Sequence, residues 1–169
     1  MLALLPRLRR FACGLTASAD DGDELLQATV ERAIRHIDKW QPGTRLDSWM
    51  FQIARNLNLN NIRARRVRGT NLQPVELDDV RGEDGRRVME SKLTFEAVRR
   101  FLGRLPEDQK VVLLLVCVEG MSYKEVAELT GVPVGTVTSR LARARMALRQ
   151  MIDGAATPAP VAETAETEA

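Results

Sequence analysis

The segment from residue 122 to residue 141 constrains the fold more strongly than any other part of the chain. Ser122 and Glu125 have the spacing of a capping box, which predicts the start of a short helix. Gly131 permits the left-handed turn that ends this helix, and Ala127 is small enough for a second helix to pack closely. The whole pattern is typical of a helix-turn-helix, and it fits an ordinary helical hairpin less well.

The second helix of this motif is expected to present short polar and cationic side chains on one face. Arginine pairs bidentately with guanine, while serine and threonine suit phosphates and base edges. We therefore predict that DNA is contacted by five side chains of this helix, namely Thr136, Thr138, Ser139, Arg140 and Arg143. Because several classes of DNA-binding protein contain a helix-turn-helix, the rest of the chain must indicate the function.

Apolar side chains recur at steps of three and four along most of the chain, which predicts an all-α protein. The predicted helices cover residues 2–16, 24–40, 48–66, 93–105, 107–118, 122–130 and 133–151. A break is expected at residues 18–23, which are polar and contain Gly22. The third helix is expected to take its cap from Asp47 or Ser48. The longest apolar run is too short for a membrane span, which needs about 18 residues, so no membrane insertion is expected.

Two segments depart from this helical pattern. Residues 69–92 lose the apolar periodicity, are rich in acidic residues and contain proline and glycine, which predicts a flexible linker. Residues 153–169 are acidic and contain no basic residue, so we expect a disordered tail. The sequence thus predicts two small helical domains, residues 1–68 and residues 93–152, of which the second has four helices.

The formal net charge of +2 averages over segments of opposite sign. Basic residues outnumber acidic ones in residues 1–73 and 97–152, whereas acidic residues prevail in residues 74–96 and 153–169. The two basic segments are the predicted helical domains. Attraction to phosphates requires such local positive charge, so the small total does not argue against a nucleic-acid partner.

One face of the predicted helix 48–66 is unusually polar. Four asparagines and three arginines lie between Asn56 and Arg66, although asparagine is a mediocre helix former. Two interpretations remain open for this face. It is either a solvated helix surface or a surface that binds nucleic-acid edges and phosphates.

The chain offers no recognisable set of catalytic or metal-binding residues. Cys13 and Cys117 are far apart and belong to no Cys-x-x-Cys pair, so we interpret them as ordinary thiols of a reduced, cytoplasmic protein. His36 is the only histidine and has no evident partner for general-base catalysis. Carboxylate clusters and glycine-rich phosphate loops are lacking as well. We therefore expect no enzymatic activity, no cofactor and no small-molecule substrate.

Three stretches, taken in order, are similar to one protein family. They are Asp23-Glu-Leu-Leu-Gln-Ala-Thr-Val-Glu-Arg-Ala33, then Pro42-Gly-Thr-Arg-Leu-Asp-Ser-Trp-Met-Phe-Gln-Ile-Ala-Arg-Asn-Leu57 with the arginine-rich sequence through Arg68, and Leu105-Pro-Glu-Asp-Gln-Lys-Val-Val-Leu113 with the helix-turn-helix. With them, the chain resembles an extracytoplasmic-function (ECF) sigma factor of bacterial RNA polymerase over about residues 2–150. The resemblance implies a subunit that binds core polymerase and directs transcription from promoters with −10 and −35 elements.

The same resemblance implies roles for particular residues and partners. The N-terminal domain would dock on the clamp helices of the polymerase β′ subunit through Leu25, Leu26, Gln27, Val30 and Glu31. It would capture the −10 strand of promoter DNA through a loop and a helix that contain Lys39, Trp40, Arg45, Asn56, Asn60, Arg63, Arg65 and Arg66. The C-terminal domain would place its recognition helix in the −35 major groove and touch the β flap. An anti-sigma factor is a further expected partner, because such proteins commonly inhibit this family.

Three alternatives remain open at this stage. The aliphatic docking residues could instead belong to the core. Trp49 and Phe51 could stack on bases, although Trp49 is expected to lie in the core. The alternative function is a helix-turn-helix transcriptional regulator with an N-terminal partner-binding domain. Such a regulator would bind duplex DNA without polymerase, at two symmetric half-sites.

Overall fold

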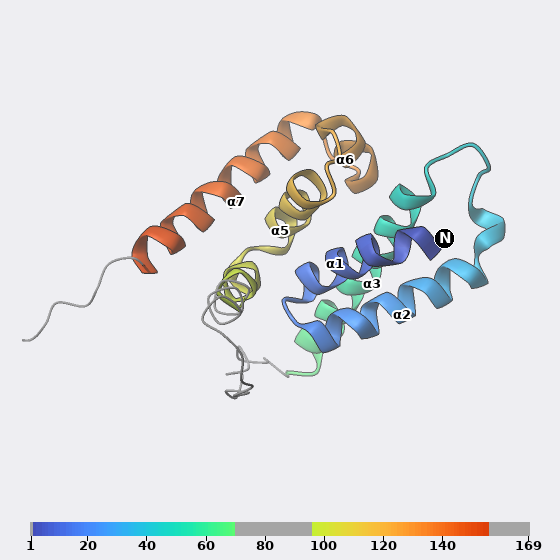
Figure 1. Cartoon of the computed structure of the whole chain (residues 1–169), viewed down its shortest axis with the longest axis horizontal. Coiled ribbons are helices and arrows are strands. Elements are labelled where there is room, and N and C mark those ends of the chain that lie inside the picture. The colour runs from blue at the N-terminus through green and yellow to red at the C-terminus, as the bar shows by residue number, and fades with distance from the viewer. Residues whose placement is uncertain (1, 70–95, 156–169) are drawn as a thin grey trace, which may run out of the picture.

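The computed structural model describes residues 2–69 and 96–155. All regular elements in these two ranges are helices, so the all-α prediction is confirmed for the described part of the chain (Figure 1). The predicted linker lies outside the described residues except for Gly69, and the predicted tail lies outside them from residue 156 onward. The boundaries of the two domains therefore stay predictions. None of the described helices is long and apolar enough to cross a membrane.

Three long helices form the N-terminal half, and they lie side by side in Figure 1. With two short 3-10 segments, the elements are η1 (Leu2–Leu4), α1 (Leu5–Thr16), α2 (Ala19–Arg35), η2 (Ile37–Lys39) and α3 (Leu46–Val67). Pro6 lies in the first turn of α1, where its missing N–H breaks no helical hydrogen bond. Leu8, Phe11 and Leu15 are buried on the inner face of α1, at the predicted steps of three and four.

The connection between α1 and α2 is shorter than the break predicted at residues 18–23. Ser18 caps α2, and its hydroxyl oxygen accepts the Asp21 backbone N–H at 3.3 Å. Gly22 lies inside the helix, where a Cβ atom would come within 2.6 Å of the Cα atom of Cys13 in α1. The predicted break was wrong because this glycine serves close helix packing rather than a turn.

The connection between α2 and α3 also differs from the prediction. α2 ends at Arg35 and is followed by η2, so the helix is shorter than expected. Arg45, with φ −72° and ψ 111°, is the N-cap residue of α3 and makes no side-chain cap. Asp47 lies in the first turn, where its carboxylate accepts the Ser48 backbone N–H at 2.8 Å and suits the positive helix end. The predicted cap at Asp47 or Ser48 was therefore wrong.

Four helical units form the C-terminal half, as predicted. They are the helix over residues 96–104, α5 (Glu107–Leu113) with its continuation η3 (Leu114–Val118), α6 (Tyr123–Thr130) and α7 (Val134–Ala155). η3 is a π-helical turn, in which the Glu119 N–H bonds to the Leu114 carbonyl at 3.0 Å. α7 extends past the predicted domain end at residue 152, because no proline stops the helix before Pro158.

The predicted helix-turn-helix is formed by α6 and α7 (Figure 1). Both hydrogen bonds of the capping box are present. The Ser122 hydroxyl oxygen accepts the Glu125 N–H at 3.3 Å, and the Glu125 carboxylate accepts the Ser122 N–H at 2.7 Å. Gly131 ends α6 with φ 72°, a conformation that glycine adopts without strain. Local sequence chemistry therefore accounts for both boundaries of α6.

One apolar core extends through both halves of the chain. Phe11 and Phe51 are fully buried, with ring centroids 5.0 Å apart in an edge-to-face arrangement. Gly14 of α1 faces Leu114 of η3 so closely that a Cβ atom there would lie 2.7 Å from the leucine Cδ2 atom. α1 also packs against α5, and α3 packs against α6. The two halves therefore lie against each other, as Figure 1 shows for α1 and α5.

Candidate nucleic-acid interface

The first turns of α7 carry the five side chains predicted to contact DNA through the helix-turn-helix. Thr138 and Arg143 are exposed, and the half-buried members are Thr136, Ser139 and Arg140. The hydroxyls of Thr138 and Ser139 each donate to a backbone carbonyl of the preceding turn, at 3.1 Å and 3.0 Å. Since these protons are used inside the helix, both side chains offer acceptor oxygens to an outside ligand.

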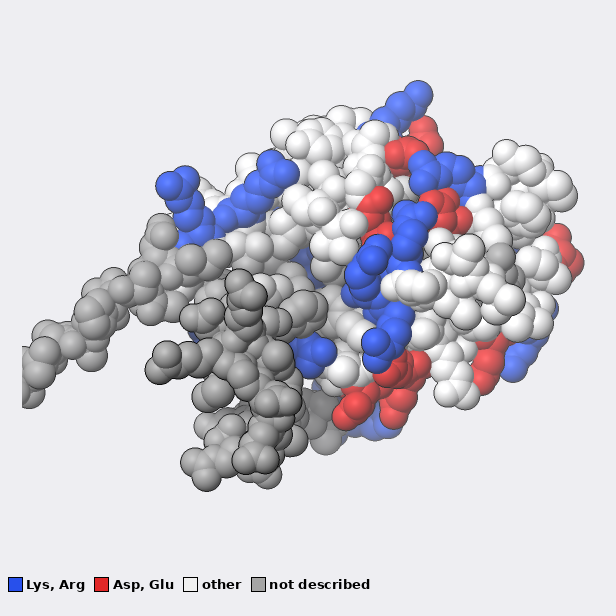
Figure 2. Space-filling view, in the orientation of Figure 1, with Lys and Arg blue, Asp and Glu red and all other residues white. Residues whose placement is uncertain are grey.

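The two arginines of this face have different surroundings. Arg140 Nη2 lies 2.6 Å from Asp108 Oδ2, which makes an ion pair between α7 and the first turn of α5. Arg143 forms no hydrogen bond or ion pair with any residue that the structure describes. In Figure 2, basic side chains project from the surface of α7 into solvent. Arg143 is therefore available to a phosphate or a guanine, whereas Arg140 must first leave Asp108.

A second polar face lies on α3. All five of its residues that were predicted to bind the −10 strand are exposed, and they are Asn56, Asn60, Arg63, Arg65 and Arg66. Arg65 Nη1 lies 3.8 Å from Asp21 of α2 in a solvent-exposed ion pair. Surface pairs of this kind contribute about 0–1 kcal/mol, so Arg65 exchanges its partner at little cost.

Asn58 does not belong to this exposed face. Its residue is 5% exposed, and its amide nitrogen donates to Glu107 Oε1 at 2.5 Å. It lies one helical turn after the buried Ala54, on the side of α3 that meets the C-terminal half. The expectation that all four asparagines share one solvated or DNA-binding face was wrong, because helical spacing does not show where a distant segment packs.

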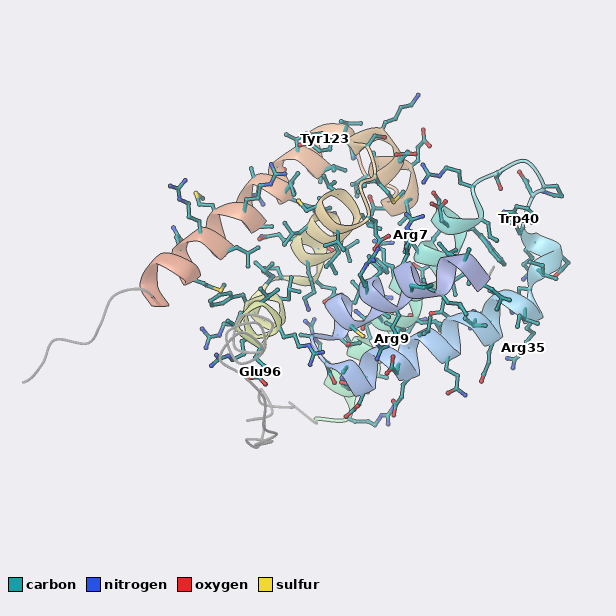
Figure 3. The ribbon with its side chains drawn as sticks, viewed as in Figure 1. Arg7, Arg9, Arg35, Trp40, Glu96 and Tyr123 are labelled. Carbon is teal, nitrogen blue, oxygen red and sulfur yellow. The ribbon has the colours of Figure 1, made fainter. Side chains whose placement is uncertain are left out.

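The connection between α2 and α3 carries the remaining predicted −10 residues, Lys39, Trp40 and Arg45. Figure 3 shows Trp40 in this connection. Lys39 is exposed, whereas the indole N–H of Trp40 is buried and has no acceptor among the described residues. Most buried donors in proteins are paired, so this loop holds a donor whose hydrogen bonding is incomplete.

Arg45 is held by carboxylates on two sides. Its Nη2 and Nε atoms lie 2.7 Å and 3.1 Å from the two Asp47 oxygens, in a bidentate arrangement. Its Nη1 atom donates to the Glu125 carboxylate of α6. The Arg45 guanidinium lowers the pKa of the Asp47 carboxyl to about 2, with smaller contributions from the Ser48 N–H and from Arg7. Asp47 therefore remains charged at physiological pH and orients Arg45.

A pocket of about 330 Å³ lies beside Arg45, between this connection and α6. Trp49 and Gln52 of α3 line one side of it, and Glu128 of α6 lines another. The predicted −10 loop thus faces the first helix of the helix-turn-helix across a small space.

The predicted polymerase-docking residues of α2 divide into three groups, which are buried, half-buried and exposed. Leu25 is 3% exposed and belongs to the core, so it supports the helix and does not reach a partner. Leu26 and Val30 are half-buried. Gln27 and Glu31 are exposed, and the Gln27 amide donates to Glu31 Oε1 at 3.1 Å. The open question of core against surface is therefore answered as core for Leu25, whereas Leu26 and Val30 pack at the edge of the core and stay partly accessible.

Two isoleucines extend this face, and sequence reasoning did not single them out. Ile34 is 60% exposed and Ile37 is 46% exposed. Ile34 follows Gln27 and Glu31 by seven and three positions, so it shares their side of α2. The spacing of Ile34 from these two polar residues was the sequence signal that could have indicated its exposure. Large apolar side chains on a polar surface suit contact with a protein partner.

Comparison with known proteins decides the family. The ECF RNA polymerase sigma factor EcfG of Rhodopseudomonas palustris is 39% identical over 157 residues, which are 92% of this chain and 85% of that protein. The chain belongs to the ECF sigma factors of RNA polymerase. The ECF RNA polymerase sigma factor SigE of Mycolicibacterium smegmatis is 33% identical to this sigma factor over 149 residues, or 86% of this chain and 57% of that protein.

Family and structural matches cover both halves of the sigma factor. The family described as Sigma-70, region 4 matches residues 95–148, and the Sigma2 domain of PhyR matches residues 1–55. The sigma factor RpoE of Bartonella quintana, solved in complex with the anti-sigma factor NepR, has a TM-score of 0.74 at 29% identity, covering 90% of this chain and 93% of that chain. CnrH, solved with the cytosolic domain of CnrY, has a TM-score of 0.65 at 25% identity, covering 90% and 84%.

These matches confirm the predicted resemblance and the predicted function. The chain is a sigma factor that serves transcription initiation, and its family is not one of enzymes.

Two aromatic residues of the sigma factor differ from their expected environments. Phe51 is fully buried against Phe11, with the Arg7 guanidinium 5.6 Å from its ring centroid, so it does not stack on a base. Trp49 packs against the edge of the core but stays partly exposed, and it lines the pocket beside Arg45. Of the two, Trp49 is therefore the one that a base could reach.

Proposed function

We propose that this sigma factor binds core RNA polymerase through the exposed face of α2 and contacts the promoter through α3 and α7. The main support is the presence of two polar faces in different halves of the chain, over residues 56–66 and residues 136–143, each of which exposes at least one arginine. Two such faces suit two promoter elements, the −10 strand and the −35 duplex. On this assignment, α2 meets the clamp helices of the β′ subunit, and the C-terminal half touches the β flap.

Control by an anti-sigma factor in the cytoplasm is part of the same proposal. The similar RpoE chain was solved with the anti-sigma factor NepR, and the similar CnrH chain was solved with the cytosolic domain of CnrY. Both relatives support a protein partner for this chain, and the second supports a cytoplasmic one.

A reconstituted transcription assay tests the proposed function. Purified sigma factor with core RNA polymerase is expected to yield transcripts from promoter fragments of its own genome that core polymerase alone does not yield. The absence of any such transcript would reject the proposal. Binding of the chain alone to two symmetric half-sites would instead support the helix-turn-helix regulator.

Ile34→Asp is expected to weaken binding to core polymerase by at least about tenfold, because it buries an unpaired charge where an apolar side chain would pack. Ile34 is 60% exposed in the free chain, so folding should change by less than about 1 kcal/mol. Leu2→Asp is the control, because Leu2 of η1 is 82% exposed and lies outside α2 and the C-terminal half, where the polymerase contacts are proposed. Binding is measured by fluorescence anisotropy of labelled sigma factor. Equal losses in both variants would contradict the assignment of the α2 face.

Arg143→Ala is expected to cost about 1–3 kcal/mol of −35 duplex binding and to relax discrimination at one base pair. The reason is that Arg143 is exposed and unpaired among the described residues, and therefore ready to bind a guanine. Arg100→Ala, at an exposed position of the helix over residues 96–104, removes the same charge and is the control. Polymerase containing each variant is titrated onto fragments with every single −35 substitution. A loss that is uniform across all fragments would indicate a phosphate contact instead.

A further inference from the structure

An ion pair within the C-terminal half joins the second helix of the helix-turn-helix to α5. These two helices, α5 and α7, pack side by side (Figure 1), and Arg140 Nη2 of α7 donates to Asp108 Oδ2 of α5 at 2.6 Å. The Asp108 side chain is 54% exposed, and the Arg140 side chain is 22% exposed. The Asp108 carboxylate therefore lies at the surface, beside the face of α7 that the proposed function directs toward DNA.

The Asp108 side chain makes this one contact. Its neighbour Glu107 turns inward, where its carboxylate accepts the Asn58 amide at 2.5 Å and lies 3.2 Å from the Lys110 ammonium. The Asp108 side chain forms no other hydrogen bond or ion pair with any residue of the described ranges. Substitution of Asp108 therefore changes the surroundings of Arg140 and leaves the contacts of Glu107 in place.

Arg143 provides a comparison on the same face of α7. It lies three positions after Arg140, and it has no side-chain partner in the part of the chain that the structure describes. Arg143 thus presents its full positive charge to DNA, whereas Arg140 and Asp108 together carry no net charge. Because affinity for phosphates comes from unpaired positive charge and counterion release, Arg143 attracts any DNA sequence and the ion pair attracts little.

A phosphate and a base edge respond differently to the Asp108 carboxylate. When Arg140 leaves Asp108 for DNA, the unpaired carboxylate stays close to the new contact. There it repels a charged phosphate, but it does not repel the uncharged edge of a guanine. Guanine also offers O6 and N7 as two acceptors for a bidentate contact, which replaces the lost hydrogen bond to Asp108.

We propose that Asp108 is a positioning residue that sets the specificity of α7, because it withholds Arg140 from phosphates and leaves this arginine to a guanine of the −35 duplex. The inference rests on the proposed function, in which α7 binds that duplex. Asp108 acts through Arg140 and makes no DNA contact of its own. Its effect is a larger ratio of specific to nonspecific duplex affinity.

The test variant is Asp108→Asn, which removes the charge and keeps the shape of the side chain. Asp20→Asn is the matched control, because Asp20 is also an exposed residue in the first turn of a helix and forms no ion pair with a described residue. Both variants have one negative charge fewer than the original chain. Asp108→Glu retains the charge, and we expect it to bind DNA as the original chain does.

Fluorescence anisotropy measures binding of the full chain to a labelled duplex of mixed sequence over a series of salt concentrations. Asp108→Asn is expected to bind about two- to fivefold more tightly than Asp20→Asn at low salt. The slope of log affinity against log salt concentration should be steeper by about 0.9, the value for one additional phosphate contact. On a promoter fragment that supports transcription, the gain should be smaller, so the ratio of specific to nonspecific affinity falls. Equal affinities and equal slopes for the two variants on the mixed duplex would overturn the inference.

A double-mutant cycle separates the ion pair from the charge of Asp108 alone. In an Arg140→Ala background, Asp108→Asn is expected to leave the salt slope unchanged, because no arginine remains for Asp108 to hold. The same increase of slope in both backgrounds would contradict the inference, since the carboxylate would then act on DNA without Arg140.

The proposed function and the role of Asp108 fail by different results. A chain that supports promoter-specific transcription, but shows no coupling between Asp108 and Arg140 in the cycle, keeps the proposed function and rejects the role of Asp108. A chain that shows the coupling on the mixed duplex, but yields no transcript, rejects the proposed function and keeps the control of Arg140 by Asp108.

Discussion

Lys110→Ala is expected to lower the free energy of unfolding by about 3–5 kcal/mol, because it removes a buried ammonium that pairs with Glu107 inside α5 and donates a hydrogen bond to the other half of the chain. The Lys110 ammonium donates to the Leu15 carbonyl and pairs with Glu107, while Lys110 itself is only 6% exposed. Its removal leaves the carbonyl without this donor and leaves Glu107 with the Asn58 amide alone. Each buried acceptor that loses its partner costs about 1–3 kcal/mol, which is consistent with the expected total.

Urea denaturation followed by circular dichroism measures this effect. Lys124→Ala removes a lysine from an exposed position of α6, and it should change the free energy of unfolding by no more than about 0.5 kcal/mol. The slope of the free energy against urea concentration is compared between the two variants, because equal slopes indicate that both unfold in a single transition. Denaturation midpoints that agree between the two variants would show that the free chain does not form the Lys110 contact.

Phe51→Ala is expected to destabilise the protein by about 3–5 kcal/mol, the range found when a fully buried aromatic ring is truncated. The ring is 0% exposed, packs edge-to-face on Phe11 at 5.0 Å, and lies under the Arg7 guanidinium. Its loss therefore removes apolar burial, an aromatic pair and a cation–π contact in one step. We expect a smaller fraction of the Phe51 variant to be folded, and we expect the folded molecules to keep an unchanged DNA-binding surface.

The control for Phe51→Ala is Tyr123→Ala, because Tyr123 is an aromatic residue that is 38% exposed at the start of α6. Thermal denaturation gives the stability of each variant, and DNA binding is normalised to the folded fraction at low temperature. A Phe51 variant that kept the original melting temperature but lost single-strand binding would show that the ring stacks on a base after all.

Features encoded by neighbouring residues were predictable from the sequence. The capping box of Ser122 and Glu125, the left-handed Gly131 and the first-turn Pro6 each act within one or two helical turns. For that reason the helix-turn-helix and the all-α class followed from spacing alone. The exposed polar face of α3 also followed from spacing, apart from Asn58.

Features that depend on distant residues were not predictable in this way. Asn58 is buried where it bonds to Glu107, and position 22 must be glycine because Cys13 packs so closely against it. The period of a helix reveals neither of these contacts. The same holds for Arg45, whose partner Glu125 lies 80 residues away in sequence. Periodicity identifies the apolar side of a helix, but it does not say which second segment covers that side. For this reason, the apolar spacing along α2 did not show that Leu25 lies in the core whereas Ile34 is exposed.

The π-helical turn η3 has a consequence for how the chain tolerates changes in length. A π turn contains one residue more than an α turn, and each residue advances an α-helix by about 100°. Deleting a single residue from Leu114–Val118 would convert the π turn into a regular α turn of nearly the same total rotation, so Glu119 would still point toward Arg7. Inserting a residue there would instead rotate Glu119 by about 100° away from Arg7, so this turn tolerates loss of a residue better than gain of one.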